Sequence, residues 1–361
     1  MTAIMATATA PVPVLSASTP TGIDRYFVWM RPHDWVALFA VSFSLTLWAT
    51  TGIPLLPLRP WSVAQVYEIS QFLVLGLAVL MALRFAVRIR RRHRADLRLA
   101  RVLSARHFGR EPMVAGLRLI LAVQLVMATY TSVKQAIPMI NPARYDGALI
   151  AIEKFIHFGI NPAWMLAGSN PPQWWLTILD KAYYLWFPVK PLVIACFLTT
   201  RNWRKRNHFF AAYLSTWLVA VLIGLLWPSH GPCYVDASVF PAAEMRLCEY
   251  TQGWLGENYA SLETIRAWGN GNLVFGCGLM AMPSLHVTIC VLYVIFMWNE
   301  KPIWRWGSII YASLIFLGSL YSGWHYAIDG YAGALIAITV TWITAKLPQM
   351  QPRLSSAPSP R

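Results

Sequence analysis

The sequence predicts an all-α fold, a polytopic transmembrane helix bundle of about six to eight spans. Of the 361 residues, 57% are hydrophobic and only 12% are charged, unlike an ordinary soluble protein. Long apolar stretches recur that reach, or nearly reach, the length needed to cross a hydrocarbon layer of ~30 Å. The chain has eighteen tryptophans and fifteen tyrosines, whose amphipathic rings are enriched at the lipid–water boundary of membrane proteins. The stretches are continuous and do not alternate as barrel strands do, which favours helices.

Eight spans are expected in order along the chain. They cover residues 34–51, 67–87, 115–137, 175–199, 209–227, 279–298, 307–323 and 330–346. Each is a continuously apolar stretch, and the connections after the second, fourth, sixth and eighth carry basic residues. Basic loops stay on the cytoplasmic side, so both termini are expected to be cytoplasmic.

The net charge of +15 could indicate a nucleic-acid partner, but the arginines are distributed differently. Nine lie between residues 88 and 110, and a second basic cluster covers residues 201–206, each directly after an apolar span. Cytoplasmic anchoring loops explain both clusters. No nucleic-acid partner is therefore expected.

Four regions follow from this organisation. Residues 1–23, rich in Ala, Thr, Ser and Pro, are interpreted as a disordered cytoplasmic leader because they have neither a basic nor an apolar signal region. Residues 24–112 are expected to hold two extra transmembrane helices and the basic loop. The catalytic membrane domain is predicted at 113–346, and a disordered cytoplasmic tail at 347–361.

The outer connection at residues 228–278 is long enough to form a lid or a short helix on the membrane. It contains Cys233 and Cys248. In an oxidising compartment these two could form a disulfide, and two unpaired thiols are the alternative. The sequence shows no metal-ligand spacing, and no metal is expected.

Two histidines and an aspartate are predicted to meet at the outer ends of three spans. His286 ends the run MPSLH at 282–286, and His325 and Asp329 belong to the run GWHYAIDG at 323–330. Ionisable groups at the edge of a bilayer carry an energetic cost, so they indicate a function. His325 and Asp329 are four residues apart and would share a face on a helical turn.

This arrangement suits acid–base and nucleophilic chemistry. Asp329 would accept one imidazole proton of His325 and leave the other nitrogen as a nucleophile or base. His286 would act as general acid for a leaving alkoxide. Ser284 or nearby backbone N–H groups would face an anion. The alternatives are a structural junction in which the histidines bond backbone carbonyls, and a proton-coupled membrane transporter.

The residues also resemble a known family. The stretches CGLMAMPSLH at 277–286 and WHYAIDG at 324–330, with Gly333, are similar to two signatures of the type 2 phosphatidic acid phosphatase superfamily. Their form resembles the branch of inositol phosphorylceramide synthases and sphingomyelin-synthase-like phosphotransferases. The stretch RYDGALIAIE at 144–153 is similar more loosely. The resemblance covers roughly residues 130–346.

The resemblance implies a six-helix catalytic core and a reaction without a metal or other cofactor. It implies that His325 attacks phosphorus to give a phosphohistidine, that Asp329 activates it, and that His286 protonates the departing oxygen. The partners would be a phospholipid donor and a lipid alcohol acceptor, or water, as in sphingolipid metabolism. The expected function is transfer of a phosphoryl-linked headgroup such as phosphoinositol. Hydrolysis of a phosphatidic-acid-like or isoprenoid phosphate is the alternative.

The chain departs from the superfamily pattern at the cations that usually hold phosphate. The first signature, Lys then six residues then Arg-Pro, is absent, and the positions of the usual Ser-Arg pair hold Gly318 and Ser319. Other groups near the outer side are therefore candidates for substrate binding, each with the alternative of an ordinary boundary residue. These candidates are Lys134, Arg144, Lys181, His230 and Tyr326. We expect a bacterial inner-membrane protein with a periplasmic active site.

Overall fold

A computed structural model describes residues 30–53, 110–200, 202–240, 245–264 and 278–347. Apart from Met30, all of these belong to one compact unit, Arg31–Arg361. The predicted leader, the span at 67–87, the basic block at 88–110 apart from Arg110 itself, and all but the first residue of the predicted tail lie outside the described residues.

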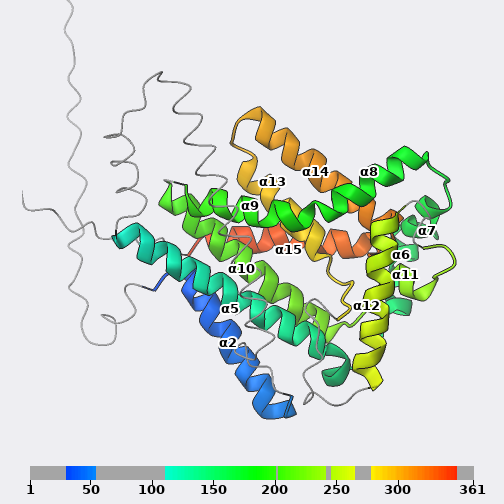
Figure 1. Ribbon diagram of the computed structural model, residues 1–361, viewed down its shortest axis with the longest axis horizontal. Coiled ribbons are helices and arrows are strands. Elements are labelled where there is room, and N and C mark those ends of the chain that lie inside the picture. The colour runs from blue at the N-terminus through cyan, green and yellow to red at the C-terminus, as the bar shows by residue number, and fades with distance from the viewer. Residues whose placement is uncertain (1–29, 54–109, 201, 241–244, 265–277, 348–361) are drawn as a thin grey trace, which may run out of the picture. The chain divides into compact units, whose positions relative to one another are not determined.

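The described residues form helices joined by loops and contain no strand, which confirms the predicted all-α bundle (Figure 1). The helices are α2 (Pro32–Thr51), α5 (Arg110–Ile140), α6 (Asp146–Ile156), α7 (Pro162–Ala167), α8 (Gln173–Tyr184), α9 (Trp186–Leu198), α10 (Trp203–Leu226), α11 (Pro232–Val235), α12 (Arg246–Thr264), α13 (Leu285–Met297), α14 (Pro302–Tyr321) and α15 (Ala327–Ala345). Five are long and apolar enough to span a membrane, namely α2, α5 from Val114 onward, α10, α14 and α15. The shorter α9 and α13 are also apolar.

The expected span at 175–199 is divided into α8 and α9. The division falls at Leu185, which is a turn between the two helices. Pro188 has no N–H to donate to the carbonyl of Tyr184 four residues earlier, and its ring crowds that carbonyl. On either side of the break, Tyr183 at the end of α8 and Trp186 at the start of α9 are buried in the bundle.

The expected span at 279–298 begins later than predicted. Helix α13 starts at Leu285, and Ser284 caps it because its side chain accepts the N–H of Val287. Residues 279–284 are a loop instead of helix, so His286 lies in the first turn and not two turns inside. This loop becomes part of the wall of the central cavity.

Helix α13 packs against α14 and α15, and α10 contacts α2, α5, α13 and α15 (Figure 1). Helices α13 and α15 approach each other closely at Gly333 of α15. A Cβ atom there would lie 2.5 Å from the Thr288 hydroxyl and 2.8 Å from the Ser284 carbonyl oxygen, both belonging to the α13 end. Glycine at this position therefore brings α15 onto the first turn of α13, where His286 lies.

Candidate active site

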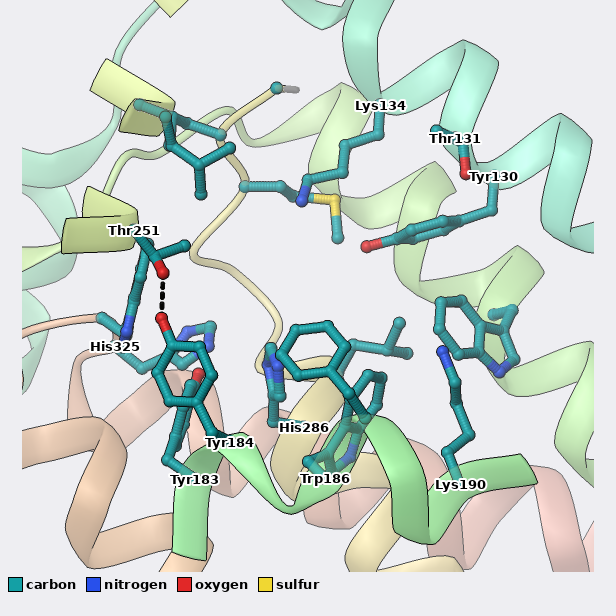
Figure 2. A pocket seen from close by; sticks show the side chains of 18 of the residues that line it. Tyr130, Thr131, Lys134, Tyr183, Tyr184, Trp186, Lys190, Thr251, His286 and His325 are labelled. Atoms are coloured by element: carbon teal, nitrogen blue, oxygen red, sulfur yellow. Dashed lines mark hydrogen bonds between the residues drawn. The ribbon is translucent and has the colours of Figure 1, made fainter. Parts of the chain in front are cut away.

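The structure brings the three predicted catalytic residues together at one end of the bundle. His286 is in the first turn of α13, His325 lies in the loop between α14 and α15, and Asp329 is in the first turn of α15. The imidazole centroids of His286 and His325 are 6.0 Å apart. Both rings line the same cavity (Figure 2).

The hydrogen bonds of His325 define its tautomer. Its Nδ1 atom is 2.8 Å from the carbonyl oxygen of Ala281, and a carbonyl can only accept. Nδ1 therefore carries the proton and donates it, which leaves the lone pair on Nε2. The sequence prediction assigned this task to Asp329, but its Oδ2 is 3.5 Å from Nδ1, at the outer limit for a hydrogen bond.

Asp329 contributes mainly by its charge and by organising the loop. Its Oδ2 accepts the backbone N–H of Tyr326 at 2.9 Å, and its backbone carbonyl accepts the N–H of Ser284 at 3.0 Å. The carboxylate thus fixes the turn that carries His325 and ties α15 to the start of α13. The shared helical turn expected for His325 and Asp329 is absent, because α15 begins only at Ala327, yet the two side chains remain in contact.

His286 is surrounded by aromatic rings from the break between α8 and α9. The ring of Tyr183 stacks on it at 4.7 Å, and the ring of Trp186 lies at 4.4 Å. Its Nε2 atom is buried and makes no hydrogen bond within the described part of the chain. The sequence prediction missed this aromatic enclosure. The pair of prolines after Tyr184, at 188 and 191, was the available signal for the break.

The cavity has a volume of about 350 Å³, within the range of small-molecule sites. Helices α5, α8, α9, α10 and α12, the first turn of α13, the loop at 278–284 and the loop before α15 supply its walls. Its lining is mainly aromatic and aliphatic, and its polar side chains besides His286 and His325 include two lysines, two threonines and a third histidine. Helix α12 is the helix expected within the 228–278 connection, and it contributes Thr251, Trp254 and Leu255.

The substrate-binding candidates separate into three groups. Lys134 and His230 line the cavity. Arg144 and Lys181 are exposed and do not line it. Lys181 follows the buried Asp180 on α8, but its own side chain points away from the cavity.

The side chains of Ser284 and Tyr326 do not face the cavity, and their hydroxyl groups form hydrogen bonds within the fold. The Ser284 hydroxyl is buried and occupied by the cap of α13. Tyr326 is fully buried, and its hydroxyl donates to Asp146 Oδ1 at 2.9 Å. Neither side chain lines the cavity.

Three buried acids that the sequence prediction did not assign hold segments around the cavity. Asp146 accepts the backbone N–H groups of His230 and Gly231, and Asp180 accepts those of Leu247 and Cys248 at the start of α12. Each acid therefore fixes a segment that lines or covers the cavity. A carboxylate that caps backbone N–H groups is favourable.

Glu153 performs the same task for α15. Its Oε1 accepts the N–H of Ala327, at the start of the helix that follows His325. Burial raises the pKa of this carboxyl group, and the hydrogen bonds from Ala327 and Ile328 oppose the rise. The stretch at 144–153, quoted for its resemblance, contains both Asp146 and Glu153 and was the signal for this role.

Replacing Tyr326 with Phe is expected to lower the free energy of unfolding by about 1.5–3 kcal/mol, because it removes a buried hydrogen bond to a carboxylate. Thermal unfolding of the detergent-solubilised protein measures the change. Tyr331→Phe is the matched control: its hydroxyl bonds the partly exposed His157, and the expected change is below about 0.5 kcal/mol. Equal effects of the two substitutions would contradict the role of the Tyr326–Asp146 bond.

Of the two alternatives left open for Cys233 and Cys248, the structure has the unpaired thiols and not the disulfide. Cys233 packs in a small cluster with Phe240 and Leu320, whereas Cys248 belongs to the main core. Burial raises the pKa of both thiols, which disfavours the thiolate needed for oxidation.

Thermal unfolding is therefore expected to be identical with and without dithiothreitol. A disulfide would contribute about 2–4 kcal/mol, so a lower melting temperature under reducing conditions would show that the bridge forms. Maleimide labelling of the denatured, unreduced protein gives an independent count: both thiols should react.

Fold and site define a class: an integral membrane protein whose apolar cavity holds two facing imidazoles. A family comparison then identifies it, because the model of the PAP2 superfamily matches residues 147–343, more than half of the chain. The chain belongs to the PAP2 superfamily and is an enzyme of that superfamily, a membrane lipid phosphatase or phosphotransferase. The matched region includes His286, His325 and Asp329.

A curated relative agrees with the branch indicated by the sequence. The chain is 28% identical over 126 residues to inositol phosphorylceramide synthase of Candida albicans, a match that covers 34% of this chain and 26% of the relative. The chain thus spans about a quarter of the length of that relative. No solved structure matches significantly.

Proposed function

We propose that this enzyme transfers a phosphoryl-linked headgroup from a phospholipid to a lipid alcohol through a phosphohistidine on His325. The observation that carries the proposal is the bond from Nδ1–H of His325 to the Ala281 carbonyl, which presents Nε2 as the nucleophile. His286 lies across the cavity, with 6.0 Å between the ring centroids. One phosphate between the two rings would touch both.

In the first step, Nε2 of His325 forms a bond to phosphorus while the bond from phosphorus to the donor oxygen breaks. His286, in its protonated form, gives its proton to that oxygen, so the donor leaves as a neutral alcohol. His325 then carries a positive charge as well as the phosphoryl group. The carboxylate of Asp329, 3.5 Å from Nδ1, stabilises this charge.

In the second step, the hydroxyl oxygen of the acceptor attacks phosphorus, and the bond from phosphorus to Nε2 breaks. His286, now neutral, takes the acceptor proton and returns to its starting form. The second step is the reverse of the first, with the acceptor in place of the departed alcohol: His325 loses the phosphoryl group and His286 regains a proton. The apolar lining of the cavity favours a lipid alcohol over bulk water as acceptor, and the similarity to inositol phosphorylceramide synthase supports phosphoinositol as the headgroup.

The same proposal includes the side of the membrane on which the reaction takes place. The start of α13, the end of α14 and the start of α15 carry the site. The basic connections predicted for the opposite end support a periplasmic or otherwise external site with cytoplasmic termini. A single cysteine introduced at exposed Phe158, near α6, tests this placement: it should react with an impermeant maleimide added to intact cells.

The phosphohistidine is tested by trapping. Rapid acid-free quenching of the enzyme with a headgroup-labelled phospholipid should leave an acid-labile phosphoryl group on His325, mapped by mass spectrometry under neutral conditions. His325→Ala should carry none. A label on another residue, or none during turnover, would reject the intermediate.

Transfer is separated from hydrolysis by following the headgroup. Phosphatidylinositol labelled in its inositol ring is supplied together with ceramide or diacylglycerol. Transfer yields a new labelled lipid that depends on the acceptor. Release of water-soluble inositol phosphate with no new lipid would reject the transferase and favour the phosphatase.

A further inference from the structure

Lys190 of α9 places a charged group inside the cavity, away from the histidines. Its Nζ atom lies 4.5 Å from the centroid of the Trp186 ring and 5.2 Å from that of Trp217. Both indoles and Lys190 itself line the cavity. In Figure 2 the Lys190 side chain rises from α9 and faces the same space as Tyr130.

Within the described residues, the Lys190 ammonium has no ion pair and no hydrogen bond, only its contacts with the two indoles. The Tyr130 hydroxyl likewise has no hydrogen-bond partner there, and its ring packs edge-on against Trp217 at 4.7 Å. An ammonium without a carboxylate inside an apolar helix bundle is costly, and such groups usually mark a ligand. Cation–π contacts offset only about 0.5–2 kcal/mol of this cost.

The position of Lys190 differs from that of the reacting phosphate. The Trp186 ring contacts the His286 ring at 4.4 Å on one side and the Lys190 ammonium on the other. Figure 2 shows Lys190 and His286 on either side of Trp186, with His325 beyond His286. The Trp186 ring therefore separates Lys190 from a phosphate held between the two imidazoles. The ammonium would contact another part of the ligand.

We propose that Lys190, with the Tyr130 hydroxyl, binds a second anionic group of the lipid substrate, a phosphate or carboxylate separate from the phosphoryl group that reacts. This inference rests on the proposed function, because it takes the reacting phosphoryl group to lie between His286 and His325. The ammonium supplies charge and up to three donors, and the tyrosine supplies one more. The indoles exclude water, which strengthens both interactions.

Binding of two short-chain lipids to the full-length protein in detergent tests this subsite. Dihexanoyl phosphatidylinositol carries one anionic group, and dihexanoyl phosphatidylinositol 4-phosphate carries a second. Calorimetric titrations use the His325→Ala background so that neither probe is consumed. The second phosphate should tighten binding about 10- to 100-fold, the range for a hydrogen bond to a charged group. Equal affinities for the two probes overturn the proposal, whatever the variants do.

Lys190→Met should remove the preference by weakening the doubly charged probe alone, and Lys190→Arg should retain most of it. Lys181→Met is the matched control, because that lysine is exposed on neighbouring α8 and does not line the cavity. Equal weakening of both probes by Lys190→Met would assign the ammonium to the reacting phosphate and overturn the proposal. Unchanged binding of both probes would overturn it too.

Inorganic phosphate is the third probe and separates a lipid-borne anion from a free one. We expect no competition at concentrations that saturate the doubly charged lipid. Tight binding of inorganic phosphate that depends on Lys190 would show a site for the free ion and overturn the lipid assignment. These titrations need no turnover. A missing phosphohistidine with the lipid preference intact would therefore reject the proposed function alone.

Discussion

Replacing His325 with alanine is expected to lower lipid turnover by about four to six orders of magnitude. The substitution removes the only nitrogen that the proposed reaction joins to phosphorus, and loss of a nucleophile has effects of this size. Initial rates of labelled-lipid consumption measure the change, alongside thermal unfolding to confirm that the variant folds. His157→Ala is the matched control, because that imidazole lies outside the cavity, bonded to Tyr331. Its turnover should stay within about twofold.

Unchanged lipid turnover in a folded His325→Ala protein would remove the proposed mechanism. The transporter interpretation then becomes testable in the same preparation, since a proton relay through His325 and Asp329 would give proton flux into proteoliposomes that the substitution abolishes. The proposed enzyme predicts the opposite pattern, with loss of chemistry and no proton flux in either protein.

The second large effect concerns His286. Replacement with alanine should lower kcat by about 10²–10⁴, the usual contribution of a general acid. The loss should depend on the leaving group. An ester that releases p-nitrophenolate needs no proton on the departing oxygen, so His286→Ala should slow formation of the phosphohistidine from it by less than about tenfold.

The comparison of leaving groups distinguishes proton donation from a structural role. If His286 only supports the packing of Tyr183 and Trp186 around it, the substitution should slow both substrates equally. An equal loss would therefore contradict its assignment as general acid. Rapid-quench measurement of the first step is required, because His286 is also proposed to act in the second.

The fold could be predicted from the sequence to a large extent because a bilayer restricts the choices. Backbone groups in hydrocarbon must bond within their own segment, so long apolar runs become helices. The predicted spans correspond to α2, α5, α10, α14 and α15 with shifted ends. The predictions were less accurate at α8–α9 and at the start of α13. Pro188 interrupts the first of these apolar runs. In the second, Ser284, preceded by Pro283, caps α13 and makes the helix begin later than the apolar run does.

The site could be predicted only in part for a related reason. The types and order of His286, His325 and Asp329 indicated their chemistry, and the positions of the spans indicated their convergence. The partner of Nδ1 could not be predicted, because the carbonyl of Ala281 lies 44 residues away along the chain. Which of Lys181 and Lys190 lines the cavity could not be predicted either, because the rotation of each helix about its axis decides which side chain faces inward.

The amino-acid sequence by itself determined the membrane-spanning class of this protein and the identity of its reactive side chains. Hydropathy and residue type are local properties, readable without a fold. Only the tertiary structure decided which nitrogen of His325 is free, which acids hold the loops, and which lysine enters the cavity. Those outcomes depend on contacts between helices distant in sequence, and small changes in the direction of one helix alter them.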